Sequence, residues 1–226
     1  SSDLRNSGTV VQSHLAEEFL RVFSADSDES EDAATSLAET GNPSAVLAFI
    51  ERLFSSPSLL RSTKNRGGGL WQIFTFVIPK LLREPNLTDR VLFAVEALYL
   101  GWFSKRRLGK LPLLQKSSPD FRPFEPSRIS DASACYMGFD FLLAKSVFAD
   151  FPSTLTKAIL RLLEKLVNSE SIHCQVAALN GLGHLHITRN AALEKERRRI
   201  VTQVMETTRD ETLKRYASEA LNHKVQ

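Results

Sequence analysis

The sequence predicts an all-α fold, a right-handed α-solenoid of about four to five helix pairs that forms a single domain over residues 1–226. Two observations predict it. Helix starts of similar character recur about every 40 residues, a period typical of stacked helix pairs. In three of the four cases a separate amphipathic helix precedes that start. A composition of 42% hydrophobic and 24% charged residues fits a globular domain.

The recurring apolar segments are expected to be the inner helices, which line the concave face of such a solenoid. The segment 173–187 is apolar around most of its circumference, so it should be packed on several sides. Gly181 and Gly183 each cost about 1 kcal/mol relative to alanine in a helix, so they should mark the close approach of a neighbouring helix. The expected inner helices are 89–103, 131–148, 170–187 and 211–222, and the expected outer helices are 67–84, 152–168 and 191–208.

The N-terminal part should contain three helices. Apolar residues at helical spacing predict the first over residues 8–23. The acidic segment 26–32 is expected to be a solvated loop or a contact for a basic partner. A short helix over residues 32–40 should end at Gly41, and the next should begin at Pro43.

Two segments interrupt the regular pattern. Residues 55–69 end in three glycines, which should form a flexible hinge or a tight helix entry and not a phosphate loop, because no Gly-Lys-Ser/Thr follows. The helix after them contains Pro79, which should kink it. Residues 108–129 hold four of the nine prolines in place of an outer helix. This irregular proline-rich repeat should either cover neighbouring repeats or contact a partner.

Aromatic and basic side chains gather just before the proline-rich segment. Such a group can stack on bases and hold phosphates, although basic residues also suit the C-terminal end of a helix. A second basic run, 195–199, should be the solvated face of its helix. The residues expected to contact a partner are Trp102, Lys105, Arg106, Arg107, Phe121 and Phe124.

No catalytic, metal or cofactor motif stands out. His173 and His184 would be about 16 Å apart along one helix, too far to share a metal ion. Asp140 lies in an apolar helix, so its carboxylate should be paired or face a groove. Cys135 and Cys174 should be buried, reduced thiols.

Residues 170–224 resemble small bacterial HEAT-like proteins of the armadillo type. The resemblance is carried by ALNGLGHLHI at 178–187, which precedes an outer helix, and then by LKRYASEAL at 213–221. It implies a HEAT-like repeat fold and favours a scaffold that binds a protein partner on its concave face.

The helical period and the chain length also resemble HEAT-like alkylpurine DNA glycosylases, so a glycosylase or another nucleic-acid-binding protein is the alternative. This resemblance implies that Asp140 and at least one of Trp71 and Trp102 converge in a basic cleft. A net charge of +3 is low for a protein that binds duplex DNA. No membrane-spanning segment is expected, and the protein should be cytoplasmic, with a removed targeting signal left open.

Overall fold

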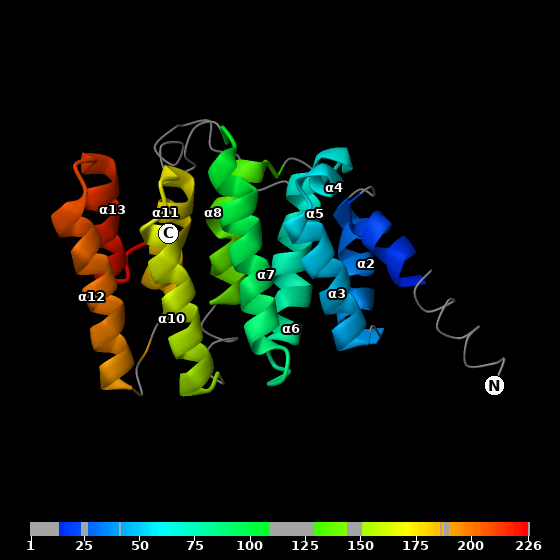
Figure 1. Cartoon of the computed structure of the whole chain (residues 1–226), viewed down its shortest axis with the longest axis horizontal. Helices are drawn as coiled ribbons and strands as arrows, with labels where there is room; N and C mark the ends of the chain where they lie inside the picture. Colours follow the sequence, from blue (N-terminus) through cyan, green and yellow to red (C-terminus); the bar gives the residue numbers. More distant parts are fainter. Residues whose placement is uncertain are drawn as a thin grey trace.

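The computed structural model describes residues 14–23, 27–40, 42–108, 129–143, 151–185, 187 and 190–225. Within these ranges every regular element is a helix (Figure 1), which confirms the all-α class. Residues 14–23 form the first helix. The others are α2 (Ser27–Thr40), α3 (Pro43–Ser55), α4 (Pro57–Ser62), α5 (Arg66–Gln72), the π-helix η1 (Ile73–Val77), α6 (Ile78–Leu81), α7 (Thr88–Gly101), the 3₁₀-helix η2 (Phe103–Lys105), α8 (Asp131–Leu142), α10 (Ser153–Val167), α11 (Ile172–His184), α12 (Ala191–Thr207) and α13 (Glu211–Leu221).

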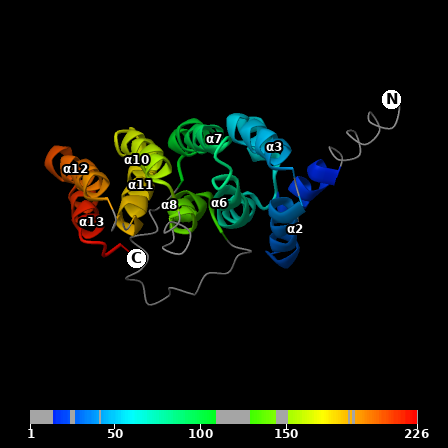
Figure 2. The ribbon, with the colours of Figure 1, turned by 90° about the horizontal axis from the view of Figure 1, so that it is seen from below.

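The longer helices lie in two rows (Figure 2). The first row contains α3, α7, α10 and α12, and each packs against the next. The second row contains the continuous helix α5–η1–α6, followed by α8, α11 and α13, again each packed against the next. Successive long helices from α3 onward alternate between the rows.

This arrangement corrects the predicted pairing of the helices. Residues 89–103 were expected beside α8, α11 and α13, but α7 lies in the first row, between α3 and α10. The expected outer helix 67–84 lies instead in the second row, as α5–η1–α6. The apolar pattern shows that both helices are buried, but it does not show which neighbour buries them. The segment 108–129 therefore connects α7 to α8 and does not replace an outer helix; residues 109–128 of it lie outside the described part of the chain.

The acidic segment 26–32 is not a loop, because α2 begins at Ser27. Asp28 and Glu29 lie in the first turn of this helix, where negative charge interacts favourably with the helix dipole. The Ser30 hydroxyl, which is buried, donates a hydrogen bond of 2.7 Å to the Val22 carbonyl. The acidic residues thus start a helix that packs on the preceding one.

The three glycines form a tight helix entry and not a hinge. They lie in the first turn of α5, and all three are buried. A Cβ atom on Gly67 would lie 1.9 Å from the Ile129 carbonyl oxygen, and one on Gly69 would lie 2.3 Å from the Phe23 ring. A kink was predicted at Pro79; the structure has a π-helical turn, η1, just before this proline. Such turns interrupt the regular hydrogen bonding of an α-helix.

The core lies between the two rows, and α11 is deeply enclosed in it. Every residue from Val176 to Gly183 is buried. The position of a Cβ on Gly181 would be 3.0 Å from the Cβ of Phe139 and 3.1 Å from Leu163, which confirms the predicted close approach of neighbouring helices. Arg197 is also fully buried, although the basic run 195–199 was expected to be solvated throughout.

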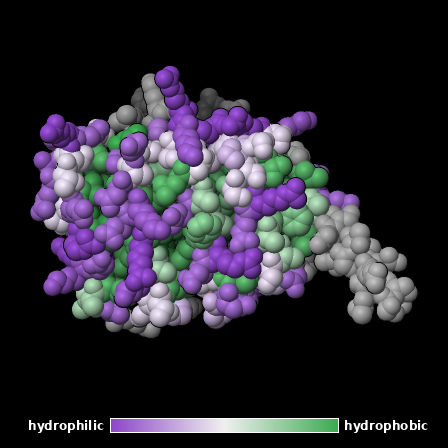
Figure 3. Space-filling model, in the orientation of Figure 1, coloured by the Kyte–Doolittle hydropathy of each residue, from purple (hydrophilic) through white to green (hydrophobic). Residues whose placement is uncertain are grey.

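Ion pairs link the neighbouring helices of the first row. Figure 3 shows this face, on which hydrophilic side chains cover most of the surface and apolar side chains appear between them. One ion pair joins each neighbouring pair of helices, at the surface. These are Arg90–Glu51 at 2.7 Å between α7 and α3, Lys165–Glu96 at 2.8 Å between α10 and α7, and Arg199–Glu164 at 2.5 Å between α12 and α10. No described helix is long and apolar enough to cross a lipid bilayer.

Candidate functional site

A basic pocket lies where α5 and α8 begin and the segment after η2 passes them. Its volume is about 450 Å³. Four cationic side chains and a single carboxylate line it, together with apolar and small residues. The lining residues are Lys64, Asn65, Arg66, Gly67, Arg106, Arg107, Leu108, Ile129, Ser130, Asp131 and Ala132.

Trp102 lies beneath the arginines of the basic pocket and is only 2% exposed. The guanidinium carbon of Arg106 is 4.2 Å from the centre of the Trp102 ring, and that of Arg66 is 5.3 Å away. Arg66 Nε donates to both carboxylate oxygens of Asp131, at 2.8 and 3.0 Å. Arg106 Nε lies 3.8 Å from the same carboxylate. Cation–π contacts and an ion pair therefore hold both guanidinium groups in place.

Local sequence explains how the basic pocket forms. Gly67 lets the start of α5 contact the backbone before α8, because any side chain there would overlap Ile129. Ser130 caps α8 by accepting a hydrogen bond of 3.1 Å from the Ser133 amide. Because this cap fixes the first turn of α8, Asp131 faces Arg66 across the junction of α5 and α8.

The structure brings together part of the predicted partner-contact group. Trp102, Arg106 and Arg107 lie in or beneath the basic pocket, whereas Lys105 is exposed in η2 and does not line it. Phe121 and Phe124 lie outside the described residues. Sequence reasoning missed Lys64, Arg66 and Asp131, because they are far from 102–107 in the chain and their partners become visible only when the helices pack. The sequence signal for this junction was the run of glycines at 67–69, which indicated a tight helix entry.

Asp140 belongs to a second group, the polar cluster, which joins α8, α11 and α13. The side-chain amide of Asn180 donates to Asp140 and to the Tyr136 carbonyl, the latter at 3.3 Å. The Tyr216 hydroxyl donates to Asn180 Oδ1 at 2.8 Å and lies 2.8 Å from the Tyr136 hydroxyl. His184 Nε2 is 3.5 Å from Asp140. The expectation that Asp140 is paired is confirmed.

Burial raises the pKa of both tyrosines in the polar cluster. Tyr136 and Tyr216 lie among apolar neighbours, and the nearby Asp140 carboxylate further disfavours a phenolate. Both hydroxyl groups therefore stay protonated at neutral pH and act as hydrogen-bond donors. This arrangement connects three helices of the second row, which is a structural role.

Of the residues predicted for a glycosylase, Asp140 and Trp102 do not converge. Trp102 contacts the arginines that surround Asp131, at the start of α8. Asp140 lies nine residues further along the same helix, about 13 Å away along its axis. Trp71 is partly buried in α5. Asp140 and Trp102 therefore belong to two separate groups of side chains.

The two cysteines are free and buried, as expected. Cys135 Sγ lies 3.9 Å from the His173 carbonyl oxygen, and Cys174 Sγ lies 3.5 Å from that of Tyr99. Burial raises the pKa of Cys135, and a hydrogen bond from this thiol lowers the pKa of Cys174. Among the described residues, no three His, Cys, Asp or Glu side chains could together hold a metal ion.

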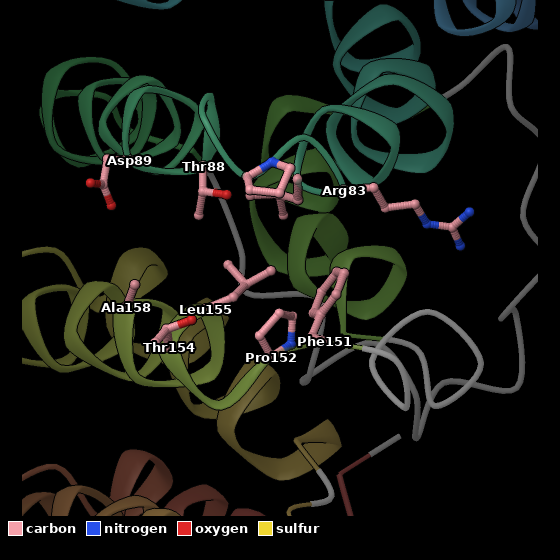
Figure 4. A pocket seen from close by; sticks show the side chains of 10 residues that line it. Arg83, Thr88, Asp89, Phe151, Pro152, Thr154, Leu155 and Ala158 are labelled. Atoms are coloured by element: carbon pink, nitrogen blue, oxygen red, sulfur yellow. The ribbon is translucent and has the colours of Figure 1, made fainter.

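A second pocket of about 590 Å³ lies at the starts of α7 and α10. Figure 4 shows Phe151 and Leu155 extending toward the turn that precedes α7, while the Arg83 side chain extends away from this space. Its charged lining residues are Arg83 and Asp89, one of each sign. It therefore lacks the charge excess of the basic pocket.

Comparisons of this chain with protein-family models, with curated proteins and with solved structures found no match.

Proposed function

We propose that this chain is a protein interaction module, a right-handed solenoid of HEAT-like helix pairs that binds a protein partner along the second row of helices. The alternation of helices between two rows supports the solenoid, since stacked helix pairs build such arrays. The proposed binding face is the second row, which consists of α5–η1–α6, α8, α11 and α13. It differs from the predicted concave face in containing α5–η1–α6 in place of residues 89–103.

The basic pocket is the observation that carries this proposal. Three cations of the first row, Arg90, Lys165 and Arg199, pair with carboxylates of neighbouring helices. Lys64 and Arg107, by contrast, form no ion pair with any residue that the structure describes. Side chains whose charges are not needed for folding are available to a ligand. The pocket therefore favours an acidic segment of the partner, which it would attract and orient electrostatically.

Affinity capture with matched charge reversals tests the proposal. The bait is the full chain, compared with an Arg106→Glu/Arg107→Glu variant and with a Lys157→Glu/Arg161→Glu control on the exposed side of α10. Proteins retained by the wild type and the control but lost by the first variant are identified by mass spectrometry. The purified candidate is then titrated against all three chains.

We expect the control to bind the candidate like the wild type and the pocket variant to bind at least about tenfold more weakly. Increasing salt should weaken the wild-type complex, because the contact is between charges near the surface. Equal affinity of the pocket variant and the control would show that the basic pocket is not the contact surface.

A further inference from the structure

We infer that the basic pocket binds a phosphate monoester, carried by a phosphorylated side chain of the partner. The inference rests on the proposed function and names the chemical group that the pocket takes.

The charge of the pocket favours phosphate over a carboxylate. Lys64, Arg66, Arg106 and Arg107 face one acid, Asp131, which leaves an excess of three positive charges. A carboxylate side chain would neutralise one of them. A phosphorylated serine or threonine carries about −1.5 to −2 charges at pH 7 and three acceptor oxygens.

The carboxylate of Asp131 does not oppose phosphate binding, because both of its oxygens accept hydrogen bonds from Arg66. The ion pair holds Arg66 at the edge of the pocket and leaves Lys64, Arg106 and Arg107 for the ligand. Arg66 therefore acts as a positioning residue.

Arg106 is the best-placed ligand group. Its guanidinium lies on the face of Trp102, and its terminal nitrogens have no hydrogen-bond partner among the described residues. A planar guanidinium presents two parallel N–H groups that match phosphate oxygens. Because the ring already restricts this side chain, binding loses less conformational entropy than it would with a free surface arginine.

The shape of the site favours a single group on a protein over a nucleic acid. A pocket of about 450 Å³ can enclose one phosphate and part of its carrier. A nucleic acid backbone presents many phosphates and is held by cations spread along its length. Three cations that lie along the first row, Arg90, Lys165 and Arg199, are instead engaged with carboxylates.

Isothermal titration calorimetry on the full chain tests the inference with four probes: inorganic phosphate, N-acetyl-phosphoserine amide, N-acetyl-aspartate amide and a single-stranded oligonucleotide. We expect the phosphoserine amide to bind at least about tenfold more tightly than the aspartate amide. Arg106→Gln and Arg107→Gln should each weaken phosphoserine binding about tenfold, and Arg161→Gln should leave it unchanged. Thermal melts show which variants are folded, and the exposed Arg107 keeps the test decisive if Arg106→Gln unfolds.

Equal affinity for phosphoserine and aspartate amides, or an equal loss in the Arg161→Gln control, would overturn the inference. Tight oligonucleotide binding that depends on Arg106 and Arg107 would overturn it in favour of a nucleic acid site. A partner that binds through these arginines without phosphorylation would contradict the inference and leave the proposed function intact. Phosphoserine binding without any captured partner would support the inference and would count against the proposed function.

Discussion

At the scale of single residues, Arg197 is the side chain that holds the C-terminal helices together. It is completely buried and donates to the carbonyls of Leu182 at 3.0 Å and Ala220 at 3.1 Å. It donates to the Leu221 carbonyl at 3.2 Å as well, and forms an ion pair of 2.8 Å with Glu194. A single guanidinium thus donates to carbonyls near the ends of α11 and α13, where the last carbonyls of a helix lack the usual intrahelical donor.

Arg197→Ala should therefore lower the free energy of unfolding by about 3–5 kcal/mol, because it removes the ion-pair partner of a partly buried carboxylate and the side-chain donor to three carbonyls. Urea denaturation followed by circular dichroism measures this change. The exposed neighbour Arg198 provides the control, and Arg198→Ala should change stability by less than about 0.5 kcal/mol. Similar effects of the two substitutions would show that the buried contacts contribute little.

The buried tyrosines predict a loss of stability in alkali. Burial raises the pKa of Tyr136 and Tyr216 in the folded chain, whereas tyrosine in an unfolded chain ionises near pH 10. Above about pH 10 the unfolded state therefore binds fewer protons than the folded state, and stability falls as the pH rises. The stabilisation is fully present below the unfolded pKa.

Urea titrations between pH 8 and pH 11 would measure this fall, at up to about 1.4 kcal/mol per pH unit for each tyrosine. A Tyr136→Phe/Tyr216→Phe variant should be less stable at pH 8 and should lose less stability on going to pH 11. An identical pH dependence in this variant would mean that other groups cause it.

At the scale of helices, glycines decide how closely neighbours approach. Gly67 lies where α5 meets the backbone before α8, whereas nothing lies within 4 Å of the Cβ position at Gly101, in the last turn of α7. The two positions are both helical but differ in their surroundings. The contact at Gly67 also sets the spacing of the basic pocket.

Gly67→Ala should destabilise the chain by about 2 kcal/mol or more, because backbone atoms must move to accept the methyl group. Gly101→Ala should instead stabilise it by up to about 1 kcal/mol, since alanine favours the helix. Thermal and urea unfolding of both variants checks the opposite signs. A stable Gly67→Ala variant would show that the junction of α5 and α8 can move apart.

At the scale of the whole molecule, the two rows give each helix a different degree of enclosure. α11 packs against α8, α10 and α13, and its residues 176–183 are all buried. α12 lies at the end of the first row and exposes several side chains, including Lys195 and Arg198. Local opening requires the loss of buried contacts, so it should be rarest where the enclosure is greatest.

Hydrogen exchange measured by mass spectrometry should therefore be slowest in peptides from α11 and faster in peptides from α12. The protection of α11 should approach that of global unfolding. Equal protection of the two helices would indicate that the end of the array opens only together with its centre.

Several helices were predictable because their signals are local. The starts near Pro43, Ser130 and Asp210 match capped helices, with side chains of Asn42, Ser130 and Asp210 accepting backbone hydrogen bonds. The apolar face of α13 was largely predictable too: Leu213, Tyr216, Ala217, Ala220 and Leu221 recur at helical spacing, and all but the half-buried Leu221 are buried. Capping and periodicity depend on residues within a few positions of one another.

The sequence by itself determined the all-α class, the positions of most helices, the tight packing at Gly181 and the pairing that Asp140 requires. Only the tertiary structure decided that α7 lies in the first row, that Arg197 is buried and that Lys64, Arg66 and Asp131 meet 106–107. The physical reason is that periodicity shows which face of a helix leaves water, but not which distant surface replaces the water. That choice depends on the packing of the whole chain.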